Sequence, residues 1–278
     1  MIREGGIADM PVVGIGRMVF WDGGGLWVLE AAGERGGADF HSHHAIQITI
    51  ALEGRFELRT AGERLSAPAV AVAPDVRHLF EADAMVAFLF VEPESRAGRA
   101  LLSSFEEGRQ LRELPAAAVA PHLPALKAAL RGGDDPDLIC LGRDLVSLLS
   151  GSTHAAIPDR RVRAMIAHAA GSLEEGVSLG SAARAAGLSE SRARHLFAAE
   201  TGLPFKTFLL WLRIRRAVEL YAAGQTLTEA AHEAGFADSA HFSRTFRRHF
   251  GLPAAALRVN SRVSRVAGAA GVPGSHAH

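Results

Sequence analysis

The sequence predicts an α+β protein of two domains: a β-barrel with following helices at the N-terminus, and an all-α domain at the C-terminus. The chain has 278 residues, which is enough for about two domains of ordinary size. Between residues 10 and 95, short segments rich in β-branched and aromatic residues alternate with turn residues. From residue 160 to about residue 258, the apolar residues instead recur with helical periodicity.

The strand-like segments lie close together in the sequence. Several short strands at such spacing favour a barrel or a sandwich. The clearest are HAIQITIAL (44–52), RFELRT (55–60), AVAVAP (69–74) and MVAFLFVE (85–92). Helical patterns follow, in AGRALLSSFEEGRQL (97–111), LPALKAAL (123–130) and PDLICLGRDLVSLLS (136–150). We therefore expect the N-terminal domain to cover residues 1–150.

A leucine stripe marks the last of these helical segments. Leu138, Leu141, Leu145 and Leu148 recur at heptad-like steps. The stripe has two interpretations, a dimer surface or a face that packs against the barrel of its own subunit. Cys140, the single cysteine, lies in the same apolar stretch, where we expect a buried, inert thiol.

The net charge of zero hides an asymmetry between the two halves. Residues 1–154 contain 14 Lys/Arg and 21 Asp/Glu, whereas residues 155–278 contain 16 Lys/Arg and 9 Asp/Glu. A basic half is the part that favours a polyanion such as nucleic acid. The chain has no run of about 18 apolar residues and no signal-peptide pattern, so we expect a cytoplasmic protein without a membrane span.

Two segments without apolar periodicity bound the C-terminal domain. The stretch at 151–160 begins with GSTHAAIPD, which is small and polar with one proline, and predicts a linker. The stretch at 261–278 predicts a disordered tail, whose last histidines we interpret as a chain end rather than a metal site. The helical domain between them covers 161–260.

An internal repeat carries the functional signal of this domain. AARAAGLSESRARHLFAAETGLP begins at residue 182, and AAHEAGFADSAHFSRTFRRHFGLP begins at residue 230. Each copy has a helix of small residues, a glycine (Gly187 or Gly235) suited to a left-handed turn, and a second helix with a candidate cap (Ser189 or Asp238). The sequence therefore predicts two helix-turn-helix motifs.

The second helix of each copy has one apolar and one polar edge. At about 100° per residue, Phe242, Phe246 and Phe250 share one side, which we expect to face the core. Arginine suits a bidentate contact with guanine, and the exposed edge of a second helix enters the major groove. The opposite edges carry Ala240, Arg244 and Arg248 in the second copy, and Ser191 and His195 beside Arg192 in the first copy.

The segment at 205–224 joins the two copies and predicts one long helix. Such a helix would hold the motifs at a fixed separation, which we expect to match successive major grooves of one duplex. Lys206 and those arginines that are not paired inside the protein are candidates for phosphate contacts, which position a protein without reading sequence.

The region 160–258 resembles the AraC/XylS family of bacterial transcriptional regulators. The resemblance is carried by GFADSAHFSRTFRRHFGLPAAALR and by DRRVRAMIAH before the first copy. It implies a DNA-binding domain and, on the first recognition helix, contacts from Ser191, Arg192, Arg194 and His195. On the second helix it implies contacts from Ser239, Ala240, Ser243 and Arg244. Members of the family often carry arginine at the position of His195.

A histidine pattern in the N-terminal domain resembles that of the cupin fold. His41 and His43 precede Gln47, which stands where cupins carry a carboxylate, and His78 follows at a distance. Alternation along a strand places His41 and His43 on the same face and His44 on the other, exposed face. Three interpretations stay open for these histidines: the lining of a polar pocket for a small-molecule effector, ligands of a divalent metal, or structural residues.

These observations together predict a transcription regulator without enzymatic activity. The expected partners are double-stranded promoter DNA, a small-molecule effector held near His41, His43, Gln47 and His78, and a second copy of the chain, with RNA polymerase added for an activator. No cofactor is expected beyond the alternative of a divalent metal on His41, His43 and His78. The competing hypothesis is a metal-dependent cupin enzyme in which the helical domain is accessory.

Overall fold

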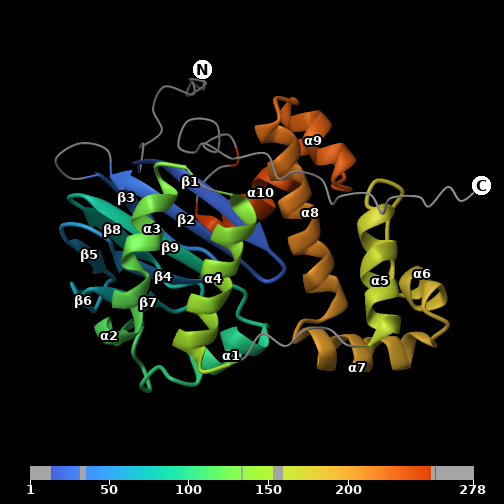
Figure 1. Cartoon of the computed structure of the whole chain (residues 1–278), viewed down its shortest axis with the longest axis horizontal. Helices are drawn as coiled ribbons and strands as arrows, with labels where there is room; N and C mark the ends of the chain where they lie inside the picture. The colour runs from blue at the N-terminus through green and yellow to red at the C-terminus, as the bar shows by residue number, and fades with distance from the viewer. Residues whose placement is uncertain (1–13, 32–35, 133, 153–158, 252–253, 255–278) are drawn as a thin grey trace, which may run out of the picture.

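The computed structural model describes residues 14–31, 36–132, 134–152, 159–251 and 254. The predicted tail and most of the predicted linker lie outside these described residues. Within them, a sheet-rich N-terminal region precedes a helical C-terminal region (Figure 1), as the sequence predicts. No helix in the described ranges combines the length and apolar character that a membrane crossing requires.

The N-terminal region contains two antiparallel sheets. The strands of the larger sheet, in spatial order, are β1 (Gly14–Trp21), β2 (Gly24–Ala31), β9 (Met85–Val91), β4 (Ile46–Ala51), β7 (Ala69–Val72) and β10 (Leu111–Glu113). Those of the smaller sheet are β3 (Gly36–His41), β8 (His78–Ala82), β5 (Phe56–Arg59) and β6 (Arg64–Leu65). The sheets face each other, and the rings of Phe80 and Phe88 meet between them at 4.9 Å.

Both faces of the larger sheet are buried, because side chains alternate in direction along each strand. On β9, Phe88 and Phe90 point toward the smaller sheet and the C-terminal helices, while Leu89 points to the opposite face. Because both faces are buried, the sequences of these strands are nearly continuous apolar runs rather than alternating patterns. Burial of a single such side chain contributes roughly 1.5–3 kcal/mol to stability.

Four helices pack on the outer face of the larger sheet (Figure 1). They are α1 (Arg96–Leu102), α2 (Ala116–Val119), α3 (Leu123–Ala129) and α4 (Asp135–Ser150), with a 3-10 turn over Ala120–His122. Leu138 and Leu145 of α4 are buried against this sheet, so this part of the leucine stripe packs on its own subunit. Leu148 is 50 % exposed and points away.

Two expectations for this region are wrong. Cys140 is exposed, because the buried face of α4 is set by Leu138, Gly142 and Leu145, and residue 140 lies on the other side of the helix. The helical pattern at 97–111 is also broken: α1 ends at Leu102, and the chain then enters β10. Pairing of β10 with the edge of β7 overrides the local helical preference there.

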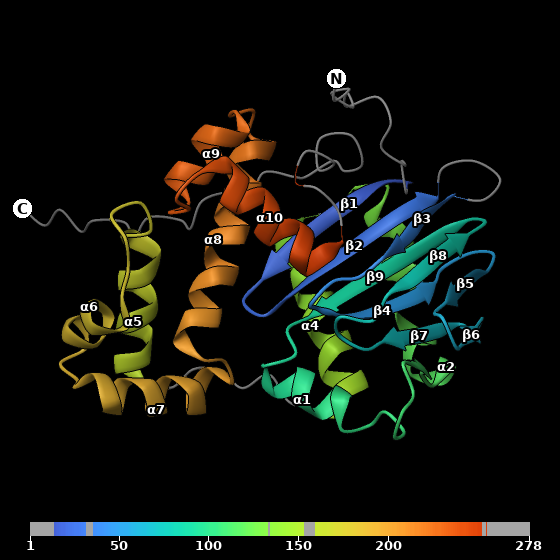
Figure 2. The same ribbon diagram turned by 180° about the vertical axis from the view of Figure 1, so that it is seen from behind.

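The C-terminal region is all-helical. Its helices are α5 (Arg160–Gly171), α6 (Leu179–Ala185), α7 (Glu190–Thr201), α8 (Phe205–Ala222), α9 (Leu227–Glu233) and α10 (Ser239–Phe250). The helix α8 stands between two groups (Figures 1 and 2). Helices α5, α6 and α7 lie on the side away from the sheets, whereas α9 lies at the upper end of α8 and α10 extends from there toward the sheets. The expected long connecting helix is therefore present.

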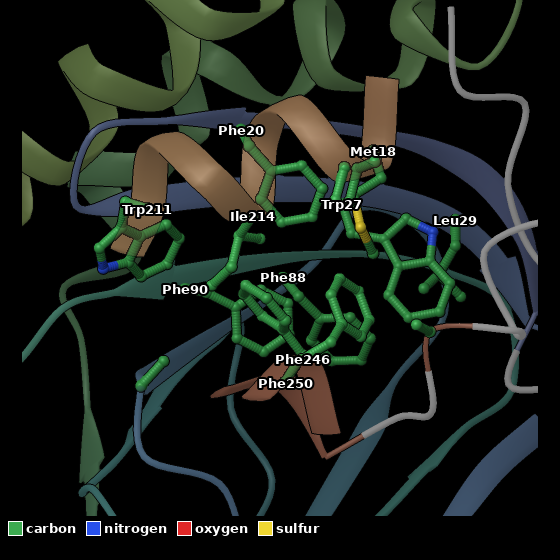
Figure 3. Close-up of a cluster of buried hydrophobic side chains, with 14 of the residues drawn as sticks. Met18, Phe20, Trp27, Leu29, Phe88, Phe90, Trp211, Ile214, Phe246 and Phe250 are labelled. Carbon is green, nitrogen blue, oxygen red and sulfur yellow. The ribbon is translucent and has the colours of Figure 1, made fainter. Parts of the chain in front are cut away.

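The two regions share one apolar core. The smaller sheet covers only part of the inner face of the larger sheet, and helices α8 and α10 pack on the remainder. Phe250 of α10 meets Phe20 at 5.3 Å, Phe90 at 5.1 Å and Trp211 at 5.7 Å, measured between ring centroids (Figure 3). The C-terminal end of α10 therefore completes the N-terminal core, which no pattern within a single domain predicts.

Candidate nucleic-acid interface and histidine cluster

The first helix-turn-helix motif consists of α6 and α7. Ala182 and Ala183 of α6 are buried, so a second helix can approach this face closely. Gly187 has a φ of 65°, the left-handed conformation expected for the turn, and the side chain of Ser189 accepts a hydrogen bond from the backbone N–H of Arg192. The predicted turn and cap of the first copy are confirmed.

The outer edge of α7 is exposed. Ala193 and Phe197 turn inward and are fully buried, which leaves the other side of the helix to solvent. The exposed side chains are those expected from the sequence, Ser191, Arg192, Arg194 and His195. These four residues form a polar, basic edge at the N-terminal half of the helix.

The second motif consists of α9 and α10. Gly235 has a φ of 78°, and a Cβ at this position would lie 2.2 Å from the carbonyl oxygen of Leu173, so a side chain is excluded. Asp238 accepts a hydrogen bond from the backbone N–H of His241 at 2.5 Å and caps α10. Phe242 and Phe246 are buried, as is Phe250, which confirms the predicted apolar edge.

The outer edge of α10 is less uniform than that of α7. Ala240, Arg244 and Arg248 are exposed, as the sequence predicts. Ser239 and Ser243 are half-buried, and the hydroxyl of Ser239 lies 3.4 Å from that of Thr228 on α9. Arg244 and Arg248 are therefore the exposed cations on the side of this helix that faces away from the phenylalanines.

The connecting helix α8 offers fewer free cations than its sequence contains. Lys206 and Arg216 are exposed, whereas Arg213 is half-buried. Arg215 is paired with Asp22 of the N-terminal domain at 3.5 Å and with Glu219 at 3.7 Å. Lys206 therefore remains a candidate phosphate contact. Arg215, in contrast, connects the two domains.

The three predicted histidines of the N-terminal domain come together in space. The rings of His41 and His78 are 4.5 Å apart, and those of His43 and His78 are 4.9 Å apart. One nitrogen from each of these three rings lies within 4.8 Å of the others. Gln47 joins them, because its Oε1 lies 2.9 Å from Nε2 of His43. We call His41, His43 and His78 the histidine cluster.

Burial keeps two of these rings neutral. The pKa of His43 is lowered to about 4, first by burial and then by the nearby His41. The pKa of His78 is lowered to about 3 by burial and by the two other rings. A neutral imidazole carries one N–H and one lone pair, which is the form that binds metals.

A backbone carbonyl oxygen faces Nδ1 in each of these two rings. Nδ1 of His43 lies 2.9 Å from the carbonyl oxygen of Ala45, and Nδ1 of His78 lies 2.9 Å from that of Val76. In His78 the Nδ1–H donates, which leaves Nε2 as a lone-pair donor. His43 has an acceptor at each ring nitrogen, the carbonyl oxygen of Ala45 and Oε1 of Gln47, so its neutral ring can donate to only one of them. Nε2 of His78 is buried and has no hydrogen-bond partner within the described part of the protein.

Sequence reasoning missed the contact between this cluster and α10. His44, expected to be exposed, has a side chain that is only 25 % exposed, because α10 lies against this rim. Its backbone N–H donates to the carbonyl oxygen of Arg248 at 2.6 Å, and its ring lies 5.8 Å from that of His249. Gly251 follows α10 directly and lies against His41. No short motif encodes a contact between residues 200 positions apart.

A buried carboxylate links the same surfaces. Glu92, at the end of β9, is 2 % exposed and accepts a hydrogen bond from Nε1 of Trp211 at 2.8 Å. Nε2 of His249 lies 3.9 Å from the same carboxylate. The only sequence signal for this residue is an acidic side chain that directly follows an apolar strand, which is common at strand ends.

A cavity of about 540 Å³ lies between the domains beside this carboxylate. Lys206 and Arg248, two of the predicted DNA contacts, line it together with Glu92 and Glu94. In this arrangement both cations face the acidic rim of the N-terminal domain. Arg244, in contrast, is exposed on the outer edge of α10.

Two capped helix-turn-helix motifs with exposed basic edges define the class of protein: a DNA-binding protein with a sheet-rich N-terminal domain. The sequence comparison agrees, because residues 182–260 match the family model described as a helix-turn-helix domain. This C-terminal segment is an AraC-type helix-turn-helix domain. No curated protein matches the chain in sequence.

Solved structures resemble the chain at low overall scores. ToxT from Vibrio cholerae is 11 % identical, with 83 % of this chain and 95 % of that chain covered and a TM-score of 0.45. An AraC-type DNA-binding domain protein from Chromobacterium violaceum is 25 % identical over 36 % of this chain and 89 % of its own, with a TM-score of 0.34. The DNA-binding domain of AdpA, in complex with a target DNA, is 24 % identical over 36 % and 92 %, with a TM-score of 0.33.

Proposed function

We propose that the protein is a one-component transcription regulator that binds promoter DNA through α7 and α10 under the control of an effector held in its N-terminal domain. The observation that carries the proposal is the equivalence of the two motifs. His195 and Arg244 occupy the same position on their respective helices, and both are exposed. Two exposed edges joined by one rigid helix are suited to one duplex.

The spacing of the motifs supports the same proposal. Helix α8 has 18 residues and is therefore about 27 Å long, at about 1.5 Å per residue. Successive major grooves on one side of B-DNA are about 34 Å apart. We propose that Arg244 and His195 contact bases, with Ser191, Arg192, Arg194, Ser239, Ala240 and Ser243 around them. Lys206 and Arg248 would contact phosphates once the domains separate.

The effector site belongs to the histidine cluster in this proposal. His43, Gln47 and His78 are buried polar residues at the end of an apolar core, and Nε2 of His78 has no hydrogen-bond partner among the described residues. A buried polar atom without a partner is suited to a ligand. A homodimer, a cytoplasmic location and contact with RNA polymerase complete the proposal. The exposed side of α4, with Leu148, is the candidate dimer surface.

A metal-dependent enzyme is the competing function, and the three clustered imidazoles favour it. Catalytic metal sites keep an open position for substrate. Here the backbone of Gly251 lies directly against His41, so the side of the cluster toward α10 is covered. The regulator accounts for this contact and for the DNA-binding domain together, whereas an enzyme leaves both without a role.

The proposal is tested by DNA binding. Fragments that bind the full-length protein are selected from genomic DNA, and their affinity is measured for the native protein and for Arg244→Ala. We expect the substitution to cost about 1–3 kcal/mol of specific binding and to relax one base position. Arg131→Ala, which removes an exposed arginine of the N-terminal domain, is the matched control. Unchanged sequence preference in Arg244→Ala contradicts the proposed role.

A further inference from the structure

We propose that His41, His43 and His78 bind a divalent transition-metal ion, and that this ion displaces the C-terminal end of α10 from the N-terminal domain. The ion would thereby free the second DNA-reading helix. The inference rests on the proposed function, because it names the class of effector and the way in which the effector acts on DNA binding.

The orientation of the rings supports metal binding. His78 donates its Nδ1–H to the carbonyl oxygen of Val76 at 2.9 Å, and Nδ1 of His43 lies at the same distance from the carbonyl oxygen of Ala45. A second hydrogen bond of this kind fixes ring orientation and tautomer in metal sites and directs Nε2 toward the ion. The buried Nε2 of His78 has no partner among the described residues, although an unpaired buried polar atom costs about 1–3 kcal/mol. An ion would satisfy it.

The composition of the site indicates the class of ion. Imidazole nitrogens suit zinc, copper, nickel and cobalt, whereas calcium and magnesium prefer oxygen ligands. The donor nitrogens lie within 4.8 Å of one another. Tetrahedral zinc, with Zn–N bonds of about 2.0–2.1 Å, requires donors about 3.4 Å apart. The three rings must therefore move closer together around the ion. The side chain of Gln47, 2.9 Å from His43, must then move away or become a further ligand.

The residue that follows α10 lies directly against the histidine cluster. Gly251 has a φ of 74°, and a Cβ built on it would lie 2.3 Å from Cδ2 and 3.0 Å from Nε2 of His41. The same Cβ would lie 3.3 Å from Cδ2 of His43. Glycine is therefore required here for close approach as well as for its backbone conformation. Movement of His41 onto an ion, and the fourth ligand of that ion, would compete with this contact.

The docked position of α10 opposes DNA binding. Lys206 and Arg248 line the cavity between the domains together with Glu92 and Glu94, so two candidate phosphate contacts face carboxylates instead of DNA. The carbonyl oxygen of Arg248 is also held by the backbone N–H of His44 at 2.6 Å. Release of α10 would return both cations to the DNA-binding surface, so the metal-bound form is the form with higher DNA affinity.

Metal binding is tested first, on the full-length protein without an added histidine tag. Calorimetric titration with ZnCl₂ is expected to give one site per chain, and Co²⁺ is expected to give the visible absorption of a tetrahedral nitrogen site. Both signals should vanish in His78→Ala and in His41→Ala, whose side chain is less buried than that of His78. They should persist in His232→Ala, an exposed histidine of α9, and after removal of His276 and His278.

Displacement is tested by hydrogen–deuterium exchange in the same protein. Zinc should accelerate exchange of the His44 backbone N–H and of the segment that ends α10. Gly251→Ala should produce the same acceleration without zinc. Gly202→Ala is the matched control, because Gly202 ends α7 with a φ of 75° and its Cβ would meet only Arg96, at 3.1 Å. Slow exchange at His44 in the zinc-bound protein would overturn the displacement.

The final measurement relates the ion to DNA. Zinc should tighten specific DNA binding about 5- to 150-fold, the usual range of coupling between two sites, and should have no such effect in His78→Ala or His41→Ala. Protein that binds specific DNA but no metal overturns this inference and leaves the proposed function intact. Protein that binds zinc but shows no specific DNA binding overturns the proposed function. If zinc instead weakens DNA binding, the inference that the metal-bound form has the higher DNA affinity is wrong.

Discussion

The backbone N–H of His44 donates to the carbonyl oxygen of Arg248 at 2.6 Å, across the boundary between the two domains. A parallel contact exists at the first motif, where the guanidinium of Arg96 donates to the carbonyl oxygen of Ala199 at 2.7 Å. The second helices of both motifs, α7 and α10, are thus held by their C-terminal halves. Ser191 and Ala240, in their N-terminal halves, are exposed.

Phe250 should determine whether the two domains unfold together. Its ring packs on Phe20 and Phe90 of the sheet, so Phe250→Ala should cost about 3–5 kcal/mol and separate one thermal transition into two. Phe197→Ala is the comparison, because Phe197 is also buried, but the rings it packs on, Phe205 and Phe208, belong to α8 of its own domain. Calorimetry distinguishes them. A single cooperative transition in Phe250→Ala would contradict the shared core.

Domain docking should weaken in acid through His249. Burial lowers the pKa of this ring, which faces Glu92, His44 and Arg248. A histidine whose folded pKa lies below its unfolded value of about 6.5 stabilises the fold above that pH, and the contribution is lost as the pH falls. The melting temperature in EDTA should therefore decrease from pH 7.5 to pH 5.5.

The decrease should be smaller in His249→Phe, which keeps an aromatic ring beside Trp211 and Phe250 but cannot be protonated. His232→Ala should behave like the native protein, because this side chain is exposed. If His249→Phe shows the same pH dependence as the native protein, His249 is not the group that titrates.

Gln47→Glu should strengthen metal binding. Gln47 is 3 % exposed, and its Oε1 lies 2.9 Å from Nε2 of His43, close enough to become a ligand. A carboxylate is a stronger ligand than an amide and offsets part of the charge of the ion. We expect zinc affinity to rise by about one to two orders of magnitude, while the metal-free protein loses stability through the buried charge.

The two expectations for Gln47→Glu are separated by measuring zinc affinity and metal-free melting temperature in parallel. Gln47→Leu, which removes the oxygen but keeps the volume, should bind zinc no more tightly than the native protein. Equal zinc affinity in the Glu and native proteins would place residue 47 outside the coordination sphere.

Lys206 and Arg248 should affect DNA affinity without affecting sequence preference. Each is exposed, and each is proposed to contact a phosphate. Lys206→Ala and Arg248→Ala should each weaken binding to all sequences by a similar factor and lower the dependence of log affinity on log salt by about one. Anisotropy titrations at several salt concentrations measure this slope. A change in preferred sequence would instead assign base contact.

The sequence alone determined the local elements of the DNA-binding domain. The positions of Gly187, Gly235, Ser189 and Asp238 are explained by backbone conformation and capping, which act within a few residues. The phenylalanine edge of α10 follows in the same way from helical periodicity. The exposure of Arg244 could therefore be predicted without coordinates.

The positions of the histidines and of Cys140 in the N-terminal domain were only partly predictable. His41 and His43 share a face because strand residues alternate, and that much follows from sequence. The approach of His78 depends on antiparallel pairing of β3 with β8, where His41 lies opposite His78. The exposure of Cys140 likewise depends on which side of α4 the sheet covers, and apolar content alone gave the wrong answer.

The way the two domains meet depends on contacts between distant parts of the chain. Phe250 completes a core formed by Phe20 and Phe90, so the reason for its apolar side chain lies outside its own helix. The sequence shows that Gly251 ends a helix. It cannot show that Gly251 lies against His41. Capping and periodicity are local effects, whereas burial depends on chain segments that become neighbours only after folding.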